Sequence, residues 1–439
     1  MFEEVYTTLM DRIENASACI VVMGLGYVGL PLATEFAKAG FKVIGYDPDR
    51  KKVASIKQGV SYVEYPSSET VEYLVKAGSL QVTSDPAVIS SADVVIVCVP
   101  TPLNKSREPD LDMVMTAIRA AKAYQKRGQL VILESTTYPG TTRELIVPAL
   151  TNNPVELGST VFVAYSPERI DPGNPTYNLN NTPKVVSGAT DKCLALAIRL
   201  YFSINEQVVA VTSLEVAEMT KILENSFRYV NIALVNELAL VSQKLGINFY
   251  EAIDAAKTKP YGFMPFYPGP GLGGHCIPVD PLYLTWKLRA IHSQSRFIEL
   301  ADEINMSMPG HVIHLTTRAL NSIQKAVNGS KILVLGVTYK PNVGDMRESP
   351  ILPIIKGLQE LGASVYYEDP YVQEAQNIVG AQRVIDEAFD WYDTVVIATP
   401  HKEFDLKQVA AKARTIVDPR GVLRGEYNKL LLSPNIFRL

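Results

Sequence analysis

The sequence predicts an α/β protein with two Rossmann-like, doubly wound domains, joined by a long central helix and a helical middle domain. Three observations lead to this fold class. A glycine-rich turn at residues 24–29 lies between an apolar, strand-like run and a helical pattern. A second series of strands and helices begins at residue 331 and repeats features of the first. Between the two series, residues 213–246 contain no proline and only a final glycine, which favours one long helix.

The composition is that of an ordinary globular protein. The 439 residues are 47% hydrophobic and 20% charged, which allows a sizeable core and two or three domains. The net charge is −4 and Lys and Arg form no cluster, so we expect no nucleic-acid partner. No run of about 18 apolar residues occurs and no signal peptide is evident, so we expect no membrane span. Four scattered cysteines fit a reducing compartment, and we expect a cytoplasmic protein.

The glycine-rich turn reads GLGYVG and follows the strand-like run at 19–23. In such a GxGxxG turn, the first glycine permits the tight turn and the second lets a pyrophosphate approach the backbone. The third glycine lets helix and strand pack closely, and the helix N-terminus attracts the phosphates. The next strand ends at Asp47. In this motif, a carboxylate about 20 residues after the last glycine is expected to bind the adenosine ribose, and Asp47 stands near that position. That carboxylate would repel a 2′-phosphate, so the pattern favours NAD over NADP.

Polar side chains follow other strand-like runs of the first domain. Thr101 and Thr136 come after two such runs, and the carboxyl ends of strands line the ligand crevice of a doubly wound sheet. We therefore expect both to face the cofactor, with plain turn residues as an equal alternative. Glu168 and Arg169 stand just past a third run and are candidates for substrate or catalytic contacts.

The long helix carries a polar stripe. Lys221, Asn225 and Arg228 have the spacing i, i+4 and i+7 and so share one face, while the other faces are apolar. A solvated face is the usual explanation of such a stripe. On a central helix at a subunit interface, it would instead be a site that supplies a general base or an oxyanion donor.

The stretch from Pro265 to Pro281, PFYPGPGLGGHCIPVDP, is too rich in proline and glycine for a helix or strand. It predicts a shaped loop, and we interpret Cys276 within it as a nucleophile. Cys276 could alternatively be a small buried hydrophobe. Metal binding by His275 and Cys276 is disfavoured, because no CxxC pair or second His cluster supplies further ligands.

The second series contains strand-like runs from KILVLGVTYK at 331–340 to TIVDPRG at 415–421. It echoes the first domain: VYYEDP repeats VIGYDP, and VVIATP repeats VVIVCVPTP. Because no GxGxxG follows its first strand, this domain is expected to bind a different nucleotide or part of a shared ligand. Lys340, Arg347 and Arg420 lie in its loops and could bind phosphates.

Taken together, these pieces resemble the nucleotide-sugar 6-dehydrogenases, the family of UDP-glucose and GDP-mannose dehydrogenases. The resemblance runs from about residue 18 to the C-terminus. It rests on GLGYVG, VPTP, ESTTYPGTT, SPERIDPGN, EMTKILENSFRYVNIALVNELA, PGPGLGGHCIPVDP, YKPNVGDMRESP and DPRG. SPERIDPGN and GGHCIPVDP differ from the corresponding segments of the UDP-glucose enzymes, where a Lys stands in place of Val279. KPYGFMPFYPGPGLGGHC is similar to that of members acting on UDP-N-acetyl sugars, N-acetylglucosamine before N-acetylmannosamine.

The resemblance implies an NAD-dependent oxidation of the C6 hydroxyl of a UDP-N-acetylhexosamine to the uronic acid, through a cysteine thiohemiacetal and thioester, for polysaccharide biosynthesis. Cys276 would be the nucleophile, Lys221 and Asn225 would stabilise the oxyanion, Asp280 would help to activate water or hydroxyl, and Glu168 would serve acid–base work. The expected cofactor contacts are Gly24, Gly26, Tyr27, Val28, Gly29, Asp47, Lys52, Thr101, Thr136 and Arg347. The expected substrate contacts are Glu168, Arg169, Lys221, Asn225, Arg228, Tyr267, Gly273, Lys340 and Arg420. No metal is expected.

The resemblance also implies an NAD-binding domain over 1–212, a central dimerisation domain over 213–325 and a UDP-sugar-binding domain over 326–439. The chain would form a homodimer or a higher homo-oligomer on its central helix. A second family carboxylate falls on Pro172 here, which leaves the role of that position open.

Other functions stay open at this point. The sugar could be N-acetylmannosamine or plain glucose. A one-step hydroxyacid dehydrogenase would use the Lys and Asn of the helix without a thiol and would release one NADH per substrate instead of two. A sugar-nucleotide sensor would release none.

Overall fold

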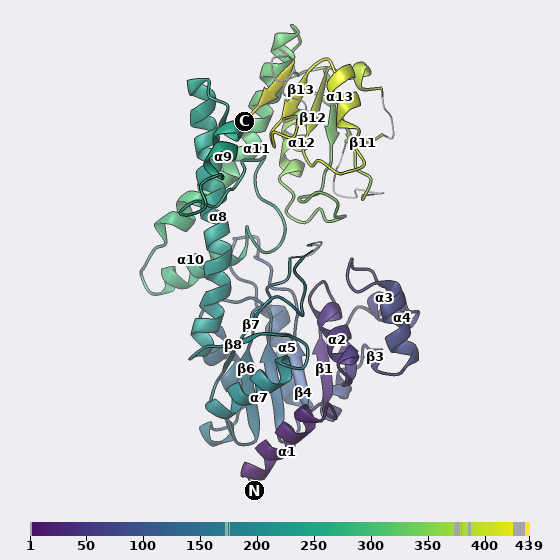
Figure 1. Ribbon diagram of the computed structural model, residues 1–439, viewed down its shortest axis with the longest axis vertical. Coiled ribbons are helices and arrows are strands. Elements are labelled where there is room, and N and C mark those ends of the chain that lie inside the picture. The colour runs from purple at the N-terminus through teal and green to yellow at the C-terminus, as the bar shows by residue number, and fades with distance from the viewer. Residues whose placement is uncertain are drawn as a thin grey trace. The chain divides into compact units, whose positions relative to one another are not determined.

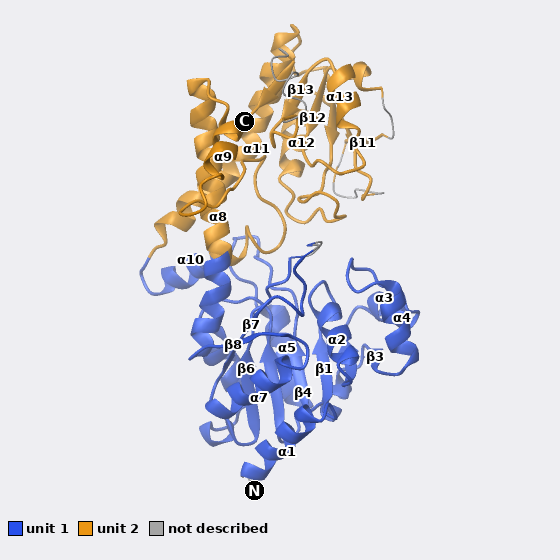
Figure 2. Ribbon diagram, viewed as in Figure 1, with its two compact units in different colours: residues 1–224, 282–293 blue, residues 225–281, 294–439 orange. Residues whose placement is uncertain are grey.

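The computed structural model describes residues 2–171, 174, 176–372, 378, 380–384, 388–424 and 435–439. The chain divides into two compact units (Figure 2). Unit 1 comprises residues 1–224 and 282–293, and unit 2 comprises residues 225–281 and 294–439. The long helix α8 (Leu214–Leu245) supplies residues to both units. The predicted fold class is confirmed, because each unit contains a Rossmann-like sheet.

Unit 1 is built on an eight-stranded sheet in the order β3-β2-β1-β4-β5-β6-β7-β8 (Figure 1). Its strands are β1 (Cys19–Met23), β2 (Lys42–Tyr46), β3 (Leu80–Thr83), β4 (Val94–Val97), β5 (Gln129–Leu133), β6 (Val161–Tyr165), β7 (Lys184–Gly188) and β8 (Val208–Ala210). Its helices are α1 (Phe2–Glu14), α2 (Gly29–Lys38), α3 (Arg50–Lys57), α4 (Ser68–Lys76), α5 (Asp112–Ala123), α6 (Val147–Leu150) and α7 (Asp191–Tyr201). All strand pairs are parallel except β6 with β7.

The central strands of unit 1 are buried on both faces, as expected for a parallel sheet covered by helices. Ile20 and Val22 of β1 belong to one apolar cluster, while Val21 and Met23 belong to another. This alternation follows from the period of two along a strand. The strand order reverses between β1 and β4, which is the position where doubly wound sheets bind their ligands.

Unit 2 contains a six-stranded sheet, in which every pair is parallel, in the order β11-β10-β9-β12-β13-β14. The strands are β9 (Lys331–Leu335), β10 (Ser364–Glu368), β11 (Gln382–Arg383), β12 (Thr394–Ile397), β13 (Ile416–Asp418) and β14 (Ile436–Arg438). The helices are α9 (Phe249–Ala256), α10 (Asp280–Ala290), α11 (Arg296–Ser322), α12 (Ile351–Glu360) and α13 (Leu406–Lys412); all but the first two residues of α10 fall in unit 1.

The two sheets repeat one local construction. In unit 1, the Asp93 carboxylate accepts a hydrogen bond from Cys19 N at 2.8 Å, where the first strand begins. In unit 2, Asp393 accepts one from Lys331 N at 2.9 Å in the corresponding place. The sequence echo therefore reflects a structural repeat, in which a buried carboxylate just before the fourth strand holds the start of the first.

We predict that Asp393→Asn lowers the free energy of unfolding of unit 2 by about 1–3 kcal/mol at pH 7, because the amide replaces a charged acceptor. Burial raises the Asp393 pKa, but hydrogen bonds from the Lys325 ammonium and Lys331 N outweigh it and hold the pKa below 3.8. This stabilisation is complete above the unfolded pKa and is lost as the pH falls through the folded-state pKa. Urea unfolding over a pH series measures it.

Asp390→Asn is the matched control, because Asp390 is exposed and three residues away. We expect that variant to unfold like the parent protein. Two results would contradict the charge-assisted role of Asp393. One is an equal loss of unfolding free energy in both variants, and the other is an Asp393→Asn variant that is still less stable than the parent protein at low pH.

Candidate active site

The glycine-rich turn of unit 1 has the geometry of a dinucleotide cradle. Gly24 has a φ of +91°, and a Cβ there would lie 2.7 Å from Cys98 O. A Cβ on Gly29 would lie 1.8 Å from Gly24 O. A Cβ on Gly26 would meet no protein atom within 4 Å. Packing therefore requires the first and third glycines, while the second keeps the backbone open to a ligand, as pyrophosphate binding demands.

The carboxylate of Asp47 lies beside this turn. Its Oδ2 accepts a hydrogen bond from Leu25 N at 2.9 Å and its Oδ1 accepts one from Asp49 N at 2.9 Å. Lys52 Nζ lies 3.5 Å from Oδ2, so the predicted cofactor residues Asp47 and Lys52 are neighbours. Tyr27 and Val28 are partly buried, and Val28 precedes the first residue of α2. These residues fit an NAD nucleotide held by backbone N–H groups and one carboxylate.

Thr101 and Thr136 both follow strands at the ligand-binding edge of the sheet, after β4 and β5 respectively. The backbone oxygen of Thr101 accepts a hydrogen bond from Tyr283 of α10 at 2.7 Å. Both threonines are partly exposed, so their side chains are not fully packed in the core. Their contact with the cofactor stays a prediction.

Glu168 and Lys221 meet in unit 1. Lys221 Nζ donates a hydrogen bond to the backbone oxygen of Glu168 at 2.5 Å, and both side chains are buried. Glu168 Oε1 accepts a hydrogen bond from Ile170 N. The Arg169 guanidinium pairs with Glu224 at 2.7 Å and donates a hydrogen bond to Pro183 O. The structure thus brings two predicted catalytic residues together and engages Arg169 in an ion pair.

Sequence reasoning missed a buried polar cluster behind Glu168, formed by Glu134, Lys184 and Tyr201. Glu134 stands in the ESTT segment, where a charged residue directly after an apolar strand was a usable signal. Lys184 and Tyr201 had no such signal, because nothing in the spacing places them near that strand. Pro172 lies outside the described residues.

Cys276 lies in the predicted loop and is partly exposed. Its backbone oxygen accepts hydrogen bonds from Val279 N at 3.1 Å and Asp280 N at 2.8 Å, just before α10 begins. By contrast, Cys98 and Cys193 are buried, and burial raises the pKa of both thiols. The alternative of a buried, packed thiol therefore describes Cys98 and Cys193, and Cys276 has the accessibility that a nucleophile requires.

Asn225 and Asp280 form a buried pair in the same unit. Asn225 Nδ2 donates a hydrogen bond to Asp280 Oδ2 at 2.5 Å. Because Asp280 N also binds the Cys276 carbonyl, the pair is linked to the loop that carries the thiol. Arg228 does not continue this buried stripe, since its side chain is exposed on α8. The predicted polar face of the helix is thus buried at Asn225 and solvated at Arg228.

The loop is held against a segment that follows β9. A Cβ on Gly273 would lie 2.5 Å from Tyr339 Cβ, so only glycine permits this close packing. Gly274 N donates a hydrogen bond to Arg347 O at 3.0 Å. The Arg347 guanidinium pairs with Asp345, with Nη2 lying 2.6 Å from Oδ2. Arg347 therefore anchors the loop through its backbone, and its predicted contact with the cofactor stays a prediction.

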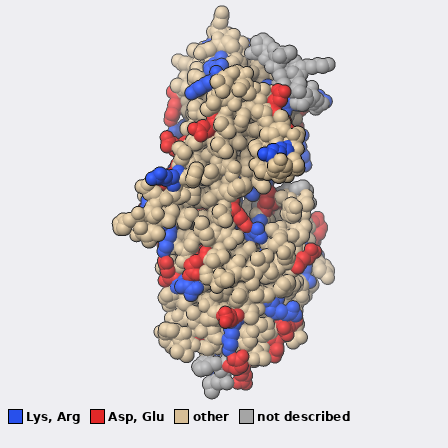
Figure 3. Space-filling model, turned by 60° about the vertical axis from the view of Figure 1, so that its left-hand side comes forward, with Lys and Arg blue, Asp and Glu red and all other residues tan. Residues whose placement is uncertain are grey.

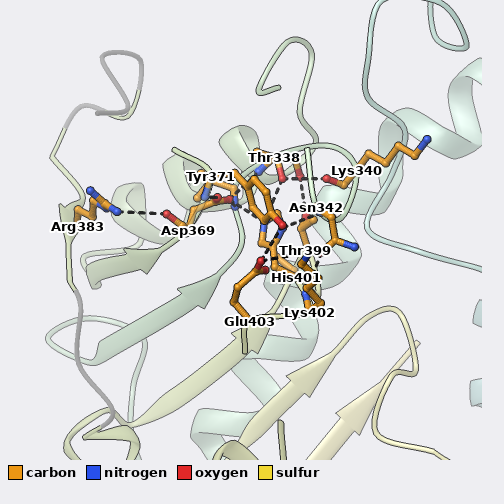
Figure 4. A network of polar contacts seen from close by, with 12 residues as sticks. Thr338, Lys340, Asn342, Asp369, Tyr371, Arg383, Thr399, His401, Lys402 and Glu403 are labelled. Carbon is orange, nitrogen blue, oxygen red and sulfur yellow. Dashed lines mark hydrogen bonds and ion pairs between the residues drawn. The ribbon is translucent and has the colours of Figure 1, made fainter. Parts of the chain in front are cut away.

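At the carboxyl edge of the second sheet, a buried histidine ties together the loops after three strands (Figure 4). His401 Nδ1 accepts a hydrogen bond from Asn342 N at 2.9 Å, so the ring proton is on Nε2. Nε2 lies 3.0 Å from Asp369 Oδ2 and 3.2 Å from Thr338 Oγ1. Hydrogen bonds from His401 and the backbone outweigh burial and lower the pKa of Asp369.

This network marks the difference between the two sheets. Asp369 Oδ2 accepts a hydrogen bond from Val337 N at 2.8 Å, as Asp47 does from Leu25 N, but Asp369 Oδ2 also contacts His401 Nε2 at 3.0 Å. The contact of Asp47 with a ribose stays a prediction. The backbone oxygen of Lys340 accepts a hydrogen bond from Thr338 Oγ1 at 3.1 Å, and the Lys340 side chain points away from the network (Figure 4). The structure thus agrees with the expectation that unit 2 binds a different nucleotide.

The remaining predicted substrate residues of unit 2 lie in separate settings. Arg420 Nε donates to Ala398 O at 2.7 Å, and burial lowers the Arg420 pKa to about 10. Tyr267 donates to Asp254 Oδ1 at 2.7 Å, and the Arg424 guanidinium lies 4.5 Å from its ring centroid. An enclosed guanidinium suits a phosphate or another anion, whereas Tyr267 is already bound by its neighbours.

Three further properties bear on function. In the described part of the chain, no three His, Cys, Asp or Glu side chains are grouped to hold a metal ion. No helix among the described residues is both long and apolar enough to cross a membrane. On the face shown in Figure 3, basic and acidic side chains are interspersed, which gives no basic surface for nucleic acid there.

Comparison with known proteins identifies the family. Three models of the UDP-glucose/GDP-mannose dehydrogenase family match in chain order: the NAD binding domain over residues 18–205, the central domain over 215–307 and the UDP binding domain over 333–425. The chain belongs to this family. It is therefore an NAD-dependent UDP-sugar 6-dehydrogenase, an oxidoreductase with a UDP-sugar substrate, and the expected family, enzyme class and cofactor are confirmed.

Relatives within the family cover nearly the whole chain. A UDP-N-acetyl-D-glucosamine 6-dehydrogenase of Pseudomonas aeruginosa is 37% identical, covering 88% of this chain and 91% of the relative. A UDP-N-acetyl-D-mannosamine dehydrogenase of Methanocaldococcus jannaschii is 35% identical, covering 93% of each chain. The solved UDP-D-ManNAc dehydrogenase of Pyrococcus horikoshii has a TM-score of 0.86 at 33% identity, covering 96% of this chain and 98% of that chain.

The glycine turn generates a prediction with a built-in control. Gly26→Ala should leave the melting temperature unchanged, because its Cβ meets open space, but kcat/KM for NAD should fall by roughly 10²-fold through displaced phosphates. Gly29→Ala should instead lower the free energy of unfolding by about 1–3 kcal/mol, because its Cβ overlaps Gly24 O. Thermal melts and initial rates distinguish them; a Gly26→Ala variant with unaltered NAD kinetics would contradict the cradle.

Proposed function

We propose that this family member oxidises the C6 hydroxyl of UDP-N-acetylglucosamine to the uronic acid, a four-electron reaction that consumes two NAD and supplies an acidic sugar for polysaccharide synthesis. The observation that carries the proposal is the partial exposure of Cys276. Its backbone oxygen accepts a hydrogen bond from Asp280 N, and the Asp280 side chain forms a buried pair with Asn225. A dehydrogenase that stopped at the aldehyde would have no need of a thiol. A thiol is needed to carry the oxidation on to the acid.

The choice of sugar rests on the loop sequence and on relatives. The KPYGFMPFYPGPGLGGHC segment is similar to that of enzymes acting on UDP-N-acetyl sugars. Relatives from Pseudomonas aeruginosa and Salmonella typhi are UDP-N-acetyl-D-glucosamine 6-dehydrogenases, at 37% and 35% identity. UDP-N-acetylmannosamine is the first alternative, since several archaeal relatives at about 35% identity act on it, and UDP-glucose is the second.

The residues present can carry each chemical step. When bound, NAD accepts one hydride from C6 in each of the two oxidations. Loss of the first hydride and of the hydroxyl proton gives the aldehyde, and the Cys276 thiolate adds to its carbonyl carbon to form a thiohemiacetal. Its oxyanion then re-forms the carbonyl as the second hydride leaves, which gives a thioester. Water attacks the thioester, the C–S bond breaks, and the carboxylate and the free thiol result.

We assign the supporting roles from chemistry and contacts. Lys221 and Asn225 stabilise the oxyanion, and Asp280 and Glu168 exchange protons with the hydroxyl or the water. Each is held before substrate binds, because Lys221 donates to Glu168 O and Asn225 donates to Asp280. Such preorganised donors avoid reorganisation during the reaction, and losing one typically costs about 10²–10³ in rate.

We also propose a division into an NAD-binding part (1–212), a central part (213–325) and a UDP-sugar-binding part (326–439), in which the central part forms a homodimer. Support comes from α8, whose apolar side chains at helical spacing are exposed in the single chain: Leu223, Phe227, Leu234, Leu238, Val241 and Leu245. An exposed apolar stripe of this length is typical of a helix that packs against another copy.

A panel of UDP-sugars with purified protein and NAD tests the activity. We expect two NADH per UDP-N-acetylglucosamine, and Cys276→Ser should lose net formation of the acid because a serine hydroxyl without a base is a weak nucleophile. Absorbance of NADH and mass spectrometry of the products measure both. Cys98→Ser is the matched control, since that thiol is buried.

Other outcomes are equally informative. A single NADH per substrate would indicate a one-step dehydrogenase, and acid formation by Cys276→Ser at the parent rate would rule out the covalent route. A faster reaction of UDP-N-acetylmannosamine or UDP-glucose would reassign the sugar.

The dimer proposal predicts that Leu234→Glu together with Leu238→Glu converts the protein to monomers, because two charges would be buried in the apolar contact. Light scattering after size exclusion measures the mass. Tyr73→Glu on α4 is the control, because Tyr73 is 71% exposed outside the stripe. A parent protein that is already monomeric, or an unchanged mass in the double variant, would refute the assignment of this stripe.

A further inference from the structure

Behind Glu168, unit 1 buries three polar side chains from separate elements. Lys184 Nζ, at the start of β7, lies 2.8 Å from Glu134 Oε2 and 3.9 Å from Glu168 Oε2. The Glu134 side chain, just after β5, has 0% exposure, and that of Lys184 has 6%. Tyr201, the last residue of α7, donates a short hydrogen bond to Glu134 Oε1 and places its ring 5.1 Å from Lys184 Nζ.

The cluster holds two carboxylates around one ammonium. Burial lowers the Lys184 pKa, but the facing carboxylates of Glu134 and Glu168 outweigh it and raise that pKa, so Lys184 carries its charge at neutral pH. Burial raises the pKa of Glu134 despite Lys184. Cys98 also faces the cluster, and burial keeps its thiol protonated by raising its pKa well above the usual value. The Lys184 ammonium is thus the charge that balances the carboxylates from within the sheet.

The two oxygens of Glu168 differ. Oε1 accepts a hydrogen bond from Ile170 N, which fixes the carboxylate in the loop after β6. Oε2 is buried and accepts no hydrogen bond from the described residues, and its contact with Lys184 at 3.9 Å is an ion pair without a hydrogen bond. Lys221 Nζ binds the backbone oxygen of Glu168 and leaves the carboxylate unused. The Glu168 carboxylate therefore keeps unused acceptor capacity.

We propose that Lys184 is a positioning residue for this dehydrogenase, whose ammonium holds the Glu168 carboxylate in the orientation in which it takes the proton of the sugar hydroxyl or of the attacking water. Glu134 and Tyr201 hold Lys184 in turn. The inference rests on the acid–base role proposed for Glu168. It adds a residue from β7 that makes no contact with the reacting atoms and acts through a charge.

The alternative is that Lys184 and Glu134 only stabilise the sheet. That alternative predicts a loss of stability and no change in proton transfer. The positioning role predicts that the acid limb of the kcat profile moves to higher pH when the ammonium is removed, because the carboxylate then holds its proton more tightly. It also predicts that another permanent cation restores the limb.

The experiment compares Lys184→Met, Lys184→Arg and the double variant Lys184→Met/Glu134→Gln. The double variant removes both charges of the buried pair, so that no carboxylate is left unpaired if the single variant fails to fold. We expect Lys184→Met and the double variant to lose about 10²-fold in kcat, with KM for NAD and UDP-sugar within about threefold. In these two variants, the acid limb of the kcat profile should move to higher pH by about one unit or more. In Lys184→Arg, the limb should lie at the parent position.

A folded double variant with an unshifted acid limb, or a loss confined to KM, would overturn the positioning role. So would failure of Lys184→Arg to restore the limb while the protein is folded. Glu168→Gln separates this inference from its premise. If Glu168→Gln abolishes the acid limb and the Lys184 variants leave it in place, only the role of Lys184 is wrong; if Glu168→Gln keeps the parent rate, the acid–base assignment falls and this inference falls with it.

Discussion

A carboxylate just past the second strand of each sheet accepts the backbone N–H of the turn after the first strand, and both nucleotide-binding edges depend on this bond. Asp47 binds Leu25 N in unit 1, and Asp369 binds Val337 N in unit 2. The bond closes the turn against the neighbouring strand, so the turn keeps its shape before any ligand arrives. Preorganisation of this kind reduces the entropy lost on binding.

The same bond serves two purposes because the surroundings of the carboxylate differ. Near Asp47, Gly26 leaves the backbone open, and the carboxylate pairs with Lys52 at 3.5 Å. In unit 2, His401 fills the corresponding edge and engages Asp369 from the loop after β12. The edge of the first sheet therefore has an open turn that suits a dinucleotide. At the edge of the second sheet, a histidine side chain binds the carboxylate, which suits a different nucleotide and agrees with the UDP binding domain of the family.

Short-range features of this fold were predictable from sequence, and long-range pairings were not. The GLGYVG turn and Asp47 lie on one continuous segment, so spacing alone places them together. The loop around Cys276 was predictable because proline and glycine exclude regular structure there. The contact of Lys184 with Glu134 and Glu168 depends on the order β5-β6-β7 and on the antiparallel pairing of β7, which no local pattern encodes. The burial of Asn225 against Asp280, 55 residues further along the chain, likewise emerged only from the structure.

The division of chemistry between strands and loop follows from what each group needs. The proton-transfer role proposed for Glu168 needs a fixed, partly desolvated carboxylate, and this side chain lies just past a sheet strand beside a buried ammonium. The nucleophilic role proposed for Cys276 needs access to a carbonyl carbon, and Cys276 is partly exposed in a loop that glycine lets pack closely on Tyr339. Cys98 shows the converse, because burial in the sheet beside Glu134 raises its pKa and keeps it unreactive. Burial thus sets Cys98 and Cys193 apart from Cys276, whose partial exposure suits the covalent role proposed for it.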